Sequence, residues 1–78
     1  MTTSARVFSA FKESLEIPDD VDTSTLVYKE YPEWTSIGHM MLVAALEAEF
    51  DTMLETDDIL AMSSFDRAVE IMTKYETV

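Results

Sequence analysis

Cysteine is absent from this sequence of 78 residues, and histidine occurs only once. A disulfide framework and a thiolate metal site are therefore excluded, and a single histidine cannot build a histidine-rich metal site. Glycine occurs once and proline twice. Turn-forming residues are therefore scarce, and no segment shows the alternation of apolar and polar residues that is typical of a strand. Both observations favour an all-α fold. Any thiol chemistry must come from an added group.

Positive charge is also scarce. Five basic residues stand against sixteen acids, which gives a formal charge of −11 at pH 7 spread along the whole chain. Such a surface repels phosphate backbones and anionic lipids and attracts basic protein partners, so we expect neither nucleic-acid nor membrane binding. No stretch approaches the roughly 18 apolar residues of a membrane span, and residues 1–10 lack the apolar core of a signal peptide. The expectation is a cytoplasmic monomer.

The first predicted helix covers residues 3–16. Val7, Phe8, Phe11 and Leu15 share an arc of about 100° on a helical wheel, which is the pattern of a buried stripe. Pro18 ends this helix because its ring prevents the helix from continuing. The length of the chain fits a single domain, residues 1–78.

A long loop is predicted over residues 17–34, where helical periodicity lapses and two prolines restrict the backbone. Its aspartates, and the pair Asp57 and Asp58, lack the spacing of a calcium loop, so we expect solvated acids there and no metal site. The expected anchors of the loop are its large apolar side chains. These are Leu26, Tyr28, Tyr31 and Trp34.

Three further helices are predicted after the loop. The second helix covers residues 36 to 50 or 51, the third is the shorter segment 56–62, and the fourth runs from the sequence SSFD to about residue 75. Together they predict a small four-helix bundle of three longer helices and one short one. Met53, Met62 and Met72 are expected to fill its core. The expected helix caps are hydroxyl side chains that can accept a hydrogen bond from an unpaired amide. They are Thr35 or Ser36 for the second helix, Thr56 for the third, and Ser63 for the fourth, where Asp66 three residues later completes a variant of the capping box.

The second helix is apolar on both faces. A core face is formed by His39, Leu42, Val43, Leu46 and Phe50. The opposite face should be polar, and instead it carries Ile37, Met40, Met41, Ala44, Glu47 and Ala48. Three other helices, one of them short, cannot enclose this helix completely. We therefore interpret the second face as a partner-docking surface. The flexible side chains of its methionines can repack against different partners.

A serine before an apolar helical run is, by itself, a plain helix cap. Residues 35–51, TSIGHMMLVAALEAEFD, nevertheless resemble the prosthetic-group segment of acyl carrier proteins. In that family an Asp-Ser-Leu triplet opens the second helix, and an apolar run closes with acids and phenylalanine. Here the triplet is Thr35, Ser36 and Ile37, and the run is LVAALEAEF. The resemblance covers nearly the whole chain and is strongest from residue 34 to residue 50.

The resemblance implies that Ser36 carries 4′-phosphopantetheine, which a separate phosphopantetheinyl transferase attaches from coenzyme A. The thiol of that arm would hold acyl groups as thioesters for acyl-activating, acyltransferase or ketosynthase-type partners in fatty-acid, polyketide or related secondary metabolism. A helix N-terminus suits the phosphodiester, because unpaired amides and the helix dipole favour an anion. The protein itself would not be an enzyme, since no base is positioned to activate Ser36 and His39 faces the core.

The chain departs from the family pattern in two ways. Thr35 replaces the common aspartate, which removes a charge that a transferase could recognise. Gly38, Met41 and Ala48 stand where acids are expected along the exposed face, which leaves Glu47 as its main charge. We therefore expect partners to dock mostly through apolar contact.

Two other functions fit the same residues. A discrete peptidyl or aminoacyl carrier would use the same serine and fold with an amino acid as cargo. An acidic helical protein-interaction module would never receive the arm, and Ser36 would then only cap the helix.

Overall fold

The computed structural model describes residues 2–76, and in this range it contains four α-helices and no strands. The helices are α1 (Thr3–Leu15), α2 (Ser36–Phe50), α3 (Thr56–Ala61) and α4 (Phe65–Tyr75), and a short 3₁₀ helix, η1 (Thr23–Thr25), lies in the loop before α2. The expected all-α bundle of three longer helices and one short one is confirmed.

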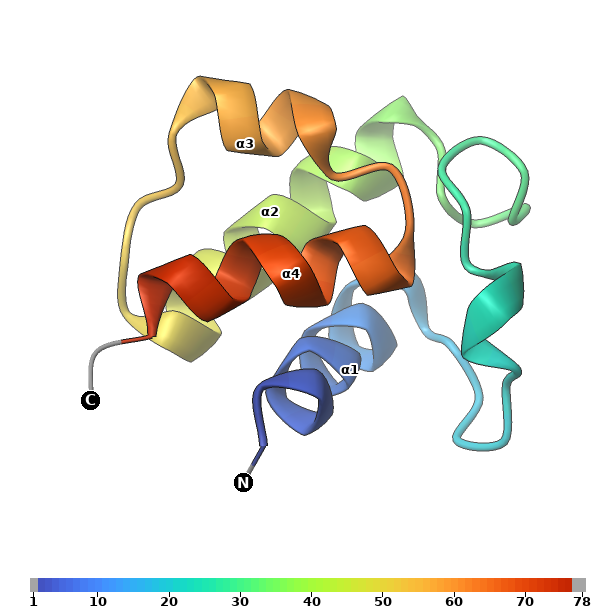
Figure 1. Cartoon of the computed structure of the whole chain (residues 1–78). Coiled ribbons are helices and arrows are strands. Elements are labelled where there is room, and N and C mark those ends of the chain that lie inside the picture. Colours follow the sequence, from blue (N-terminus) through green and yellow to red (C-terminus); the bar gives the residue numbers. More distant parts are fainter. Residues whose placement is uncertain (1, 77–78) are drawn as a thin grey trace.

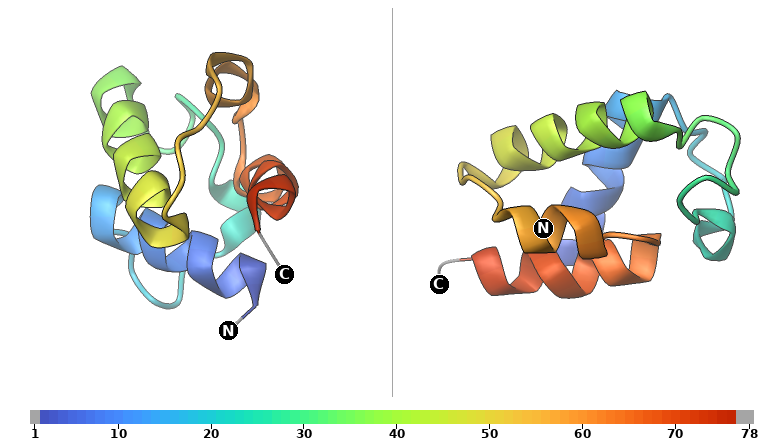
Figure 2. Two further views of the ribbon diagram at one scale, coloured as in Figure 1. Left: turned by 90° about the vertical axis from the view of Figure 1, so that its left-hand side faces the viewer. Right: turned by 90° about the horizontal axis from the view of Figure 1, so that it is seen from above.

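The helices are arranged with α2 and α4 between α1 and α3 (Figures 1 and 2). Helix α1 packs against both α2 and α4, and the long loop covers the end of the bundle where α2 begins. The expected core stripes of α1 and α2 are buried, apart from the half-buried Phe8 and His39. The largest fully buried side chain is Trp34, at the end of the loop.

Two helix caps differ from expectation. The cap of α4 is Ser64, whose hydroxyl accepts from the Arg67 amide at 3.1 Å, and not Ser63. The cap of α3 is Glu55, which makes no side-chain capping bond, so Thr56 is the first helical residue. An N-cap needs an extended backbone immediately before the first helical turn, and only Glu55 and Ser64 hold that place.

The long loop is fastened to the junction of α3 and α4. Val27 and Ser64 form an isolated antiparallel bridge, and the Tyr28 amide donates to the Ser63 carbonyl at 2.9 Å. Of the expected anchors, Leu26 and Trp34 are fully buried, and both tyrosines are half-buried. These contacts therefore fix the course of the loop as far as Trp34, the residue before the cap of α2.

Two expectations about buried and exposed residues that follow α2 are wrong. Met53 is 82% exposed and does not fill the core, because α2 ends at Phe50 and Leu54 is the buried residue after the turn. Asp58 is buried, and not solvated as expected. Met62 and Met72 do lie in the core.

The buried carboxylate of Asp58 joins α3 to α4. It accepts from the Lys74 ammonium at 2.8 Å and from the Tyr75 hydroxyl, and that hydroxyl also accepts from the Glu55 amide at 3.0 Å. The hydrogen bonds from Lys74 and Tyr75 hold the pKa of Asp58 below its ordinary value. The same contact raises the pKa of Lys74 and of Tyr75.

This contact predicts a stability that depends on pH. Because the pKa of Asp58 is lower in the folded protein than in the unfolded chain, its contribution is complete above the unfolded value of about 3.9 and is lost as the pH falls through the lowered folded value. Asp58→Asn should therefore lower the free energy of unfolding at neutral pH, with a smaller deficit in strong acid. Urea unfolding at several pH values measures this.

The matched control is Asp57→Asn, which removes the same charge from an exposed neighbour. Its free energy of unfolding should stay near that of the wild type. A deficit for Asp58→Asn that is equal at neutral and strongly acid pH would contradict the prediction.

Candidate functional site

The cap of α2 is Thr35, and Ser36 is the first residue of the helix. Thr35 has an extended backbone, its hydroxyl accepts from the Gly38 amide at 3.2 Å, and its carbonyl accepts from the His39 amide at 2.8 Å. Of the two expected candidates for this cap, Thr35 therefore fills the role. The exposed Ser36 hydroxyl is not needed to cap the helix.

The first turn of α2 keeps two amides without a protein acceptor. Within residues 2–76, the amides of Ser36 and Ile37 donate no hydrogen bond, whereas the next two amides bond to Thr35. These N–H groups lie at the positive end of the helix dipole, where an anion is favoured. The Ser36 side chain thus stands at a position that suits a negatively charged substituent.

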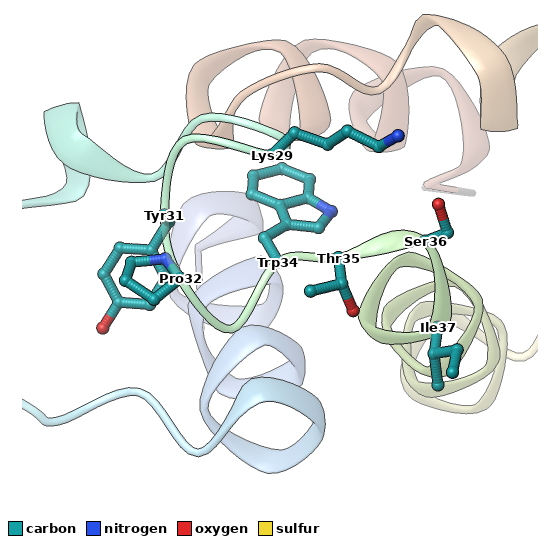
Figure 3. Close-up of a pocket in the computed structure, with 7 residues that line it drawn as sticks. All are labelled: Lys29, Tyr31, Pro32, Trp34, Thr35, Ser36 and Ile37. Carbon is teal, nitrogen blue, oxygen red and sulfur yellow. The ribbon is translucent and has the colours of Figure 1, made fainter.

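A pocket of about 530 Å³ opens beside Ser36. In Figure 3, Tyr31 and Pro32 lie on one side of the Trp34 indole, and Ser36 and Ile37 lie on the other. The Lys29 side chain runs past the upper edge of the indole, and its nitrogen ends on the same side of the indole as Ser36. The lining residues are Lys29, Tyr31, Pro32, Trp34, Thr35, Ser36 and Ile37.

His39 is held by hydrogen bonds at both ring nitrogens. Its Nδ1 accepts from the Trp34 indole N–H at 2.9 Å, so its Nε2 carries the proton and donates to the Ile59 carbonyl at 2.8 Å. The imidazole and indole rings stack with centroids 5.9 Å apart. His39 therefore faces inward, as expected, and the structure adds its two hydrogen bonds. The imidazole ring thus connects Trp34 to Ile59 of α3. Because both ring nitrogens are hydrogen-bonded, neither is available to take a proton from Ser36.

Tyr28 contacts the candidate serine, and the sequence does not predict this contact. The hydroxyl oxygens of Tyr28 and Ser36 are 3.3 Å apart, in a hydrogen bond that either can donate. The Tyr28 ring also packs against His39 and Trp34, with centroids 5.0 and 6.0 Å apart. From the sequence, Tyr28 is predicted only to anchor the loop. The spacing of residues 28 and 36 along the chain does not indicate that their side chains are in contact.

The predicted docking face of α2 is largely open. Ile37 is 75% exposed, and Met40, Met41, Ala44 and Ala48 are also exposed. Leu60 of α3, which the sequence reading did not place, is exposed as well.

Glu47 differs from the rest of the predicted docking face. It is half-buried, and its carboxylate accepts from the Leu54 amide at 2.9 Å, so it also fastens the turn after α2. The charge that was expected to dominate the docking face is therefore partly engaged within the protein.

Gly38 does not belong to the exposed face, contrary to expectation. It is buried, and a Cβ atom there would lie 2.4 Å from the Glu33 carbonyl oxygen and 3.0 Å from a methyl group of Leu15. No acid could occupy this position without moving the loop backbone. The glycine allows the loop and α1 to approach the first turn of α2 closely.

Residues 2–76 include no helix long and apolar enough to cross a membrane. They also include no group of three or more histidine, cysteine or acidic side chains arranged to hold a metal ion. A scan against protein-family models, a search of curated proteins and a search of solved structures found no match to this chain. The function is therefore argued from the geometry around Ser36.

Proposed function

We propose that this protein is an acyl carrier protein that bears 4′-phosphopantetheine on Ser36. The observation that carries the proposal is the Ser36 hydroxyl, which is exposed at the start of α2, is not used as the helix cap and opens onto a pocket. The order of helices and the resemblance of residues 35–51 to the prosthetic-group segment of that family support it.

The surroundings of Ser36 fit such a group. The attachment is a phosphodiester with one negative charge, and two unpaired amides and the helix dipole face that position. The pocket beside Ser36 leaves space for a substituent without displacing core side chains. When attached, the arm supplies a thiol that carries acyl groups as thioesters.

Attachment is a phosphoryl transfer onto the serine oxygen. The bond from the Ser36 oxygen to phosphorus forms, and the pyrophosphate bond of coenzyme A breaks. The nucleotide leaves with the bonding electron pair, and a base takes the serine proton. Since both nitrogens of His39 are engaged, that base belongs to the transferase.

Partner enzymes in fatty-acid, polyketide or related secondary metabolism would dock on the exposed face of α2. The side chains offered there are apolar, and Glu47 is partly engaged with the loop after the helix. Affinity should then come mainly from apolar burial, while the overall negative charge favours encounter with basic surfaces.

This docking mode predicts a weak dependence of affinity on salt. The dissociation constant for a loading enzyme should change by less than about threefold between roughly 0.05 and 0.5 M salt, because apolar contacts are not screened. Met41→Gln should weaken binding by about three- to tenfold, since full burial of an exposed methionine contributes about 1.5–3 kcal/mol and Met41, which is 52% exposed, has roughly half of that left to gain. Calorimetric titration measures both. A steep loss of affinity with salt, with Met41→Gln unchanged, would contradict apolar docking.

Incubation with coenzyme A and a transferase of broad specificity tests the proposal. Intact-mass spectrometry should show the addition of one phosphopantetheine group. A folded wild-type protein that stays unmodified would overturn the proposal and favour an acidic interaction module. Loading of the thiol form by an amino-acid-activating enzyme, and not by acyl-activating enzymes, would favour the peptidyl carrier.

A further inference from the structure

Lys29 is the one basic side chain that forms no ion pair within residues 2–76. Each of the other four lies within 4.0 Å of a carboxylate oxygen. These pairs are Arg6 with Glu49 and Glu76, Lys12 with Asp19, Arg67 with Glu70, and Lys74 with Asp58. Lys29 is exposed and lines the Ser36 pocket, so its charge is available to an anion bound there.

The backbone of Lys29 directs its side chain to this pocket. Lys29 has a φ of 68°, in the left-handed region that non-glycine residues seldom adopt, and its amide donates to the Trp34 carbonyl at 2.9 Å. The resulting turn brings residue 29 back beside the start of α2. From there the side chain passes the edge of the indole and ends on the side where Ser36 lies (Figure 3), and its ammonium lies 5.7 Å from the centre of the Tyr28 ring.

Tyr28 supplies a neutral donor at the same place. Its backbone is held by the bond to Ser63 and its ring by Trp34 and His39, so its hydroxyl is fixed 3.3 Å from the Ser36 oxygen. Esterification removes the hydroxyl proton of Ser36. After it, only Tyr28 can donate in this contact, and an ester or phosphate oxygen must accept.

We propose that Tyr28 and Lys29 together hold the phosphodiester on Ser36. The Tyr28 hydroxyl donates to an oxygen of the phosphodiester, and the Lys29 ammonium balances its negative charge, which would otherwise add to the −11 of the chain. This inference rests on the proposed function and adds two positioning residues to it. Both belong to the loop, so the loop and the first turn of α2 form one site.

Phosphorus NMR of the phosphopantetheinylated protein tests the inference. The ³¹P resonance of the folded wild type should be displaced from its position in the urea-unfolded protein. Tyr28→Phe and Lys29→Gln should each remove a large part of that displacement, and the double variant should remove most of it. The melting temperature should rise on modification of the wild type, and it should rise less in each variant.

Two matched controls separate a local effect from a general one. Lys12→Gln removes the same charge from a lysine paired with Asp19, and Tyr31→Phe removes a hydroxyl that points away from Ser36 in Figure 3. Both controls should keep the wild-type ³¹P shift. Lys29→Gly relieves the left-handed strain, so it should melt no lower than the wild type before modification and still lose the displacement.

The outcomes distinguish this inference from the function on which it rests. If the wild type cannot be modified, both fall. If it is modified, but Tyr28→Phe and Lys29→Gln keep the wild-type ³¹P shift and melting increment, only the inference is overturned. The inference would also be overturned if Lys12→Gln and Tyr31→Phe removed as much of the ³¹P displacement as Lys29→Gln and Tyr28→Phe do.

Discussion

Ser36→Ala is expected to receive no phosphopantetheine under conditions that modify the wild type completely. The proposed attachment needs a nucleophilic oxygen at the start of α2, and this substitution removes it without removing the cap. Thr35 supplies both acceptors for the first helical turn, so the fold does not depend on the Ser36 hydroxyl. The free energy of unfolding should fall by about 1 kcal/mol at most. Intact mass and urea unfolding measure the two effects.

Thr35→Ala is the matched control for Ser36→Ala. It should lose about 1 kcal/mol of stability, because the Gly38 amide loses its acceptor, and it should still accept the arm. Modification of the Ser36→Ala protein would remove Ser36 as the attachment site. Collapse of its fold would show that the serine has a structural role.

Trp34→Ala is expected to have the largest effect on stability. The indole is fully buried, packs edge-on against Phe11 with centroids 5.0 Å apart, and donates to His39. Truncating a buried tryptophan costs about 3–5 kcal/mol, which is comparable to the whole stability of a domain of this size. Urea unfolding followed by circular dichroism should show a protein that is largely unfolded without denaturant.

Two further variants provide reference values for the loss of stability in Trp34→Ala. Trp34→Phe keeps an aromatic ring but leaves His39 Nδ1 without its donor, so a loss of about 1–3 kcal/mol is expected. Met53→Ala changes an apolar side chain that is exposed, and should stay within about 0.5 kcal/mol of the wild type. A Trp34→Ala protein as stable as Met53→Ala would contradict the role assigned to the indole.

The helices could be predicted from the sequence because they depend on contacts between near neighbours. The stripe of Val7, Phe11 and Leu15 repeats at the helical period, and Pro18 prevents continuation. The same local logic placed a hydroxyl residue at the start of α2. It could not decide between Thr35 and Ser36, because the cap depends on which residue has the extended backbone.

Two of the errors, at Asp58 and Gly38, arose where contacts with other parts of the fold decide the environment. Asp58 is buried because Lys74 and Tyr75 of α4 reach its carboxylate, and no spacing within α3 shows this. Gly38 is buried because the Glu33 carbonyl and α1 press on the first turn of α2. A helical wheel describes one helix alone and cannot include such neighbours.

Local sequence patterns are sufficient to predict the four helices, the long loop and a serine at the start of an apolar helix. The surroundings of that serine depend on the fold of the whole chain. The Tyr28 hydroxyl contacts Ser36, and Lys29 lines the same pocket, because the loop is bonded to the junction of α3 and α4 and turns back at residue 29. The periodicity of apolar residues indicates which residues share a helix face. Whether a loop packs against the end of a helix depends instead on how the whole chain packs.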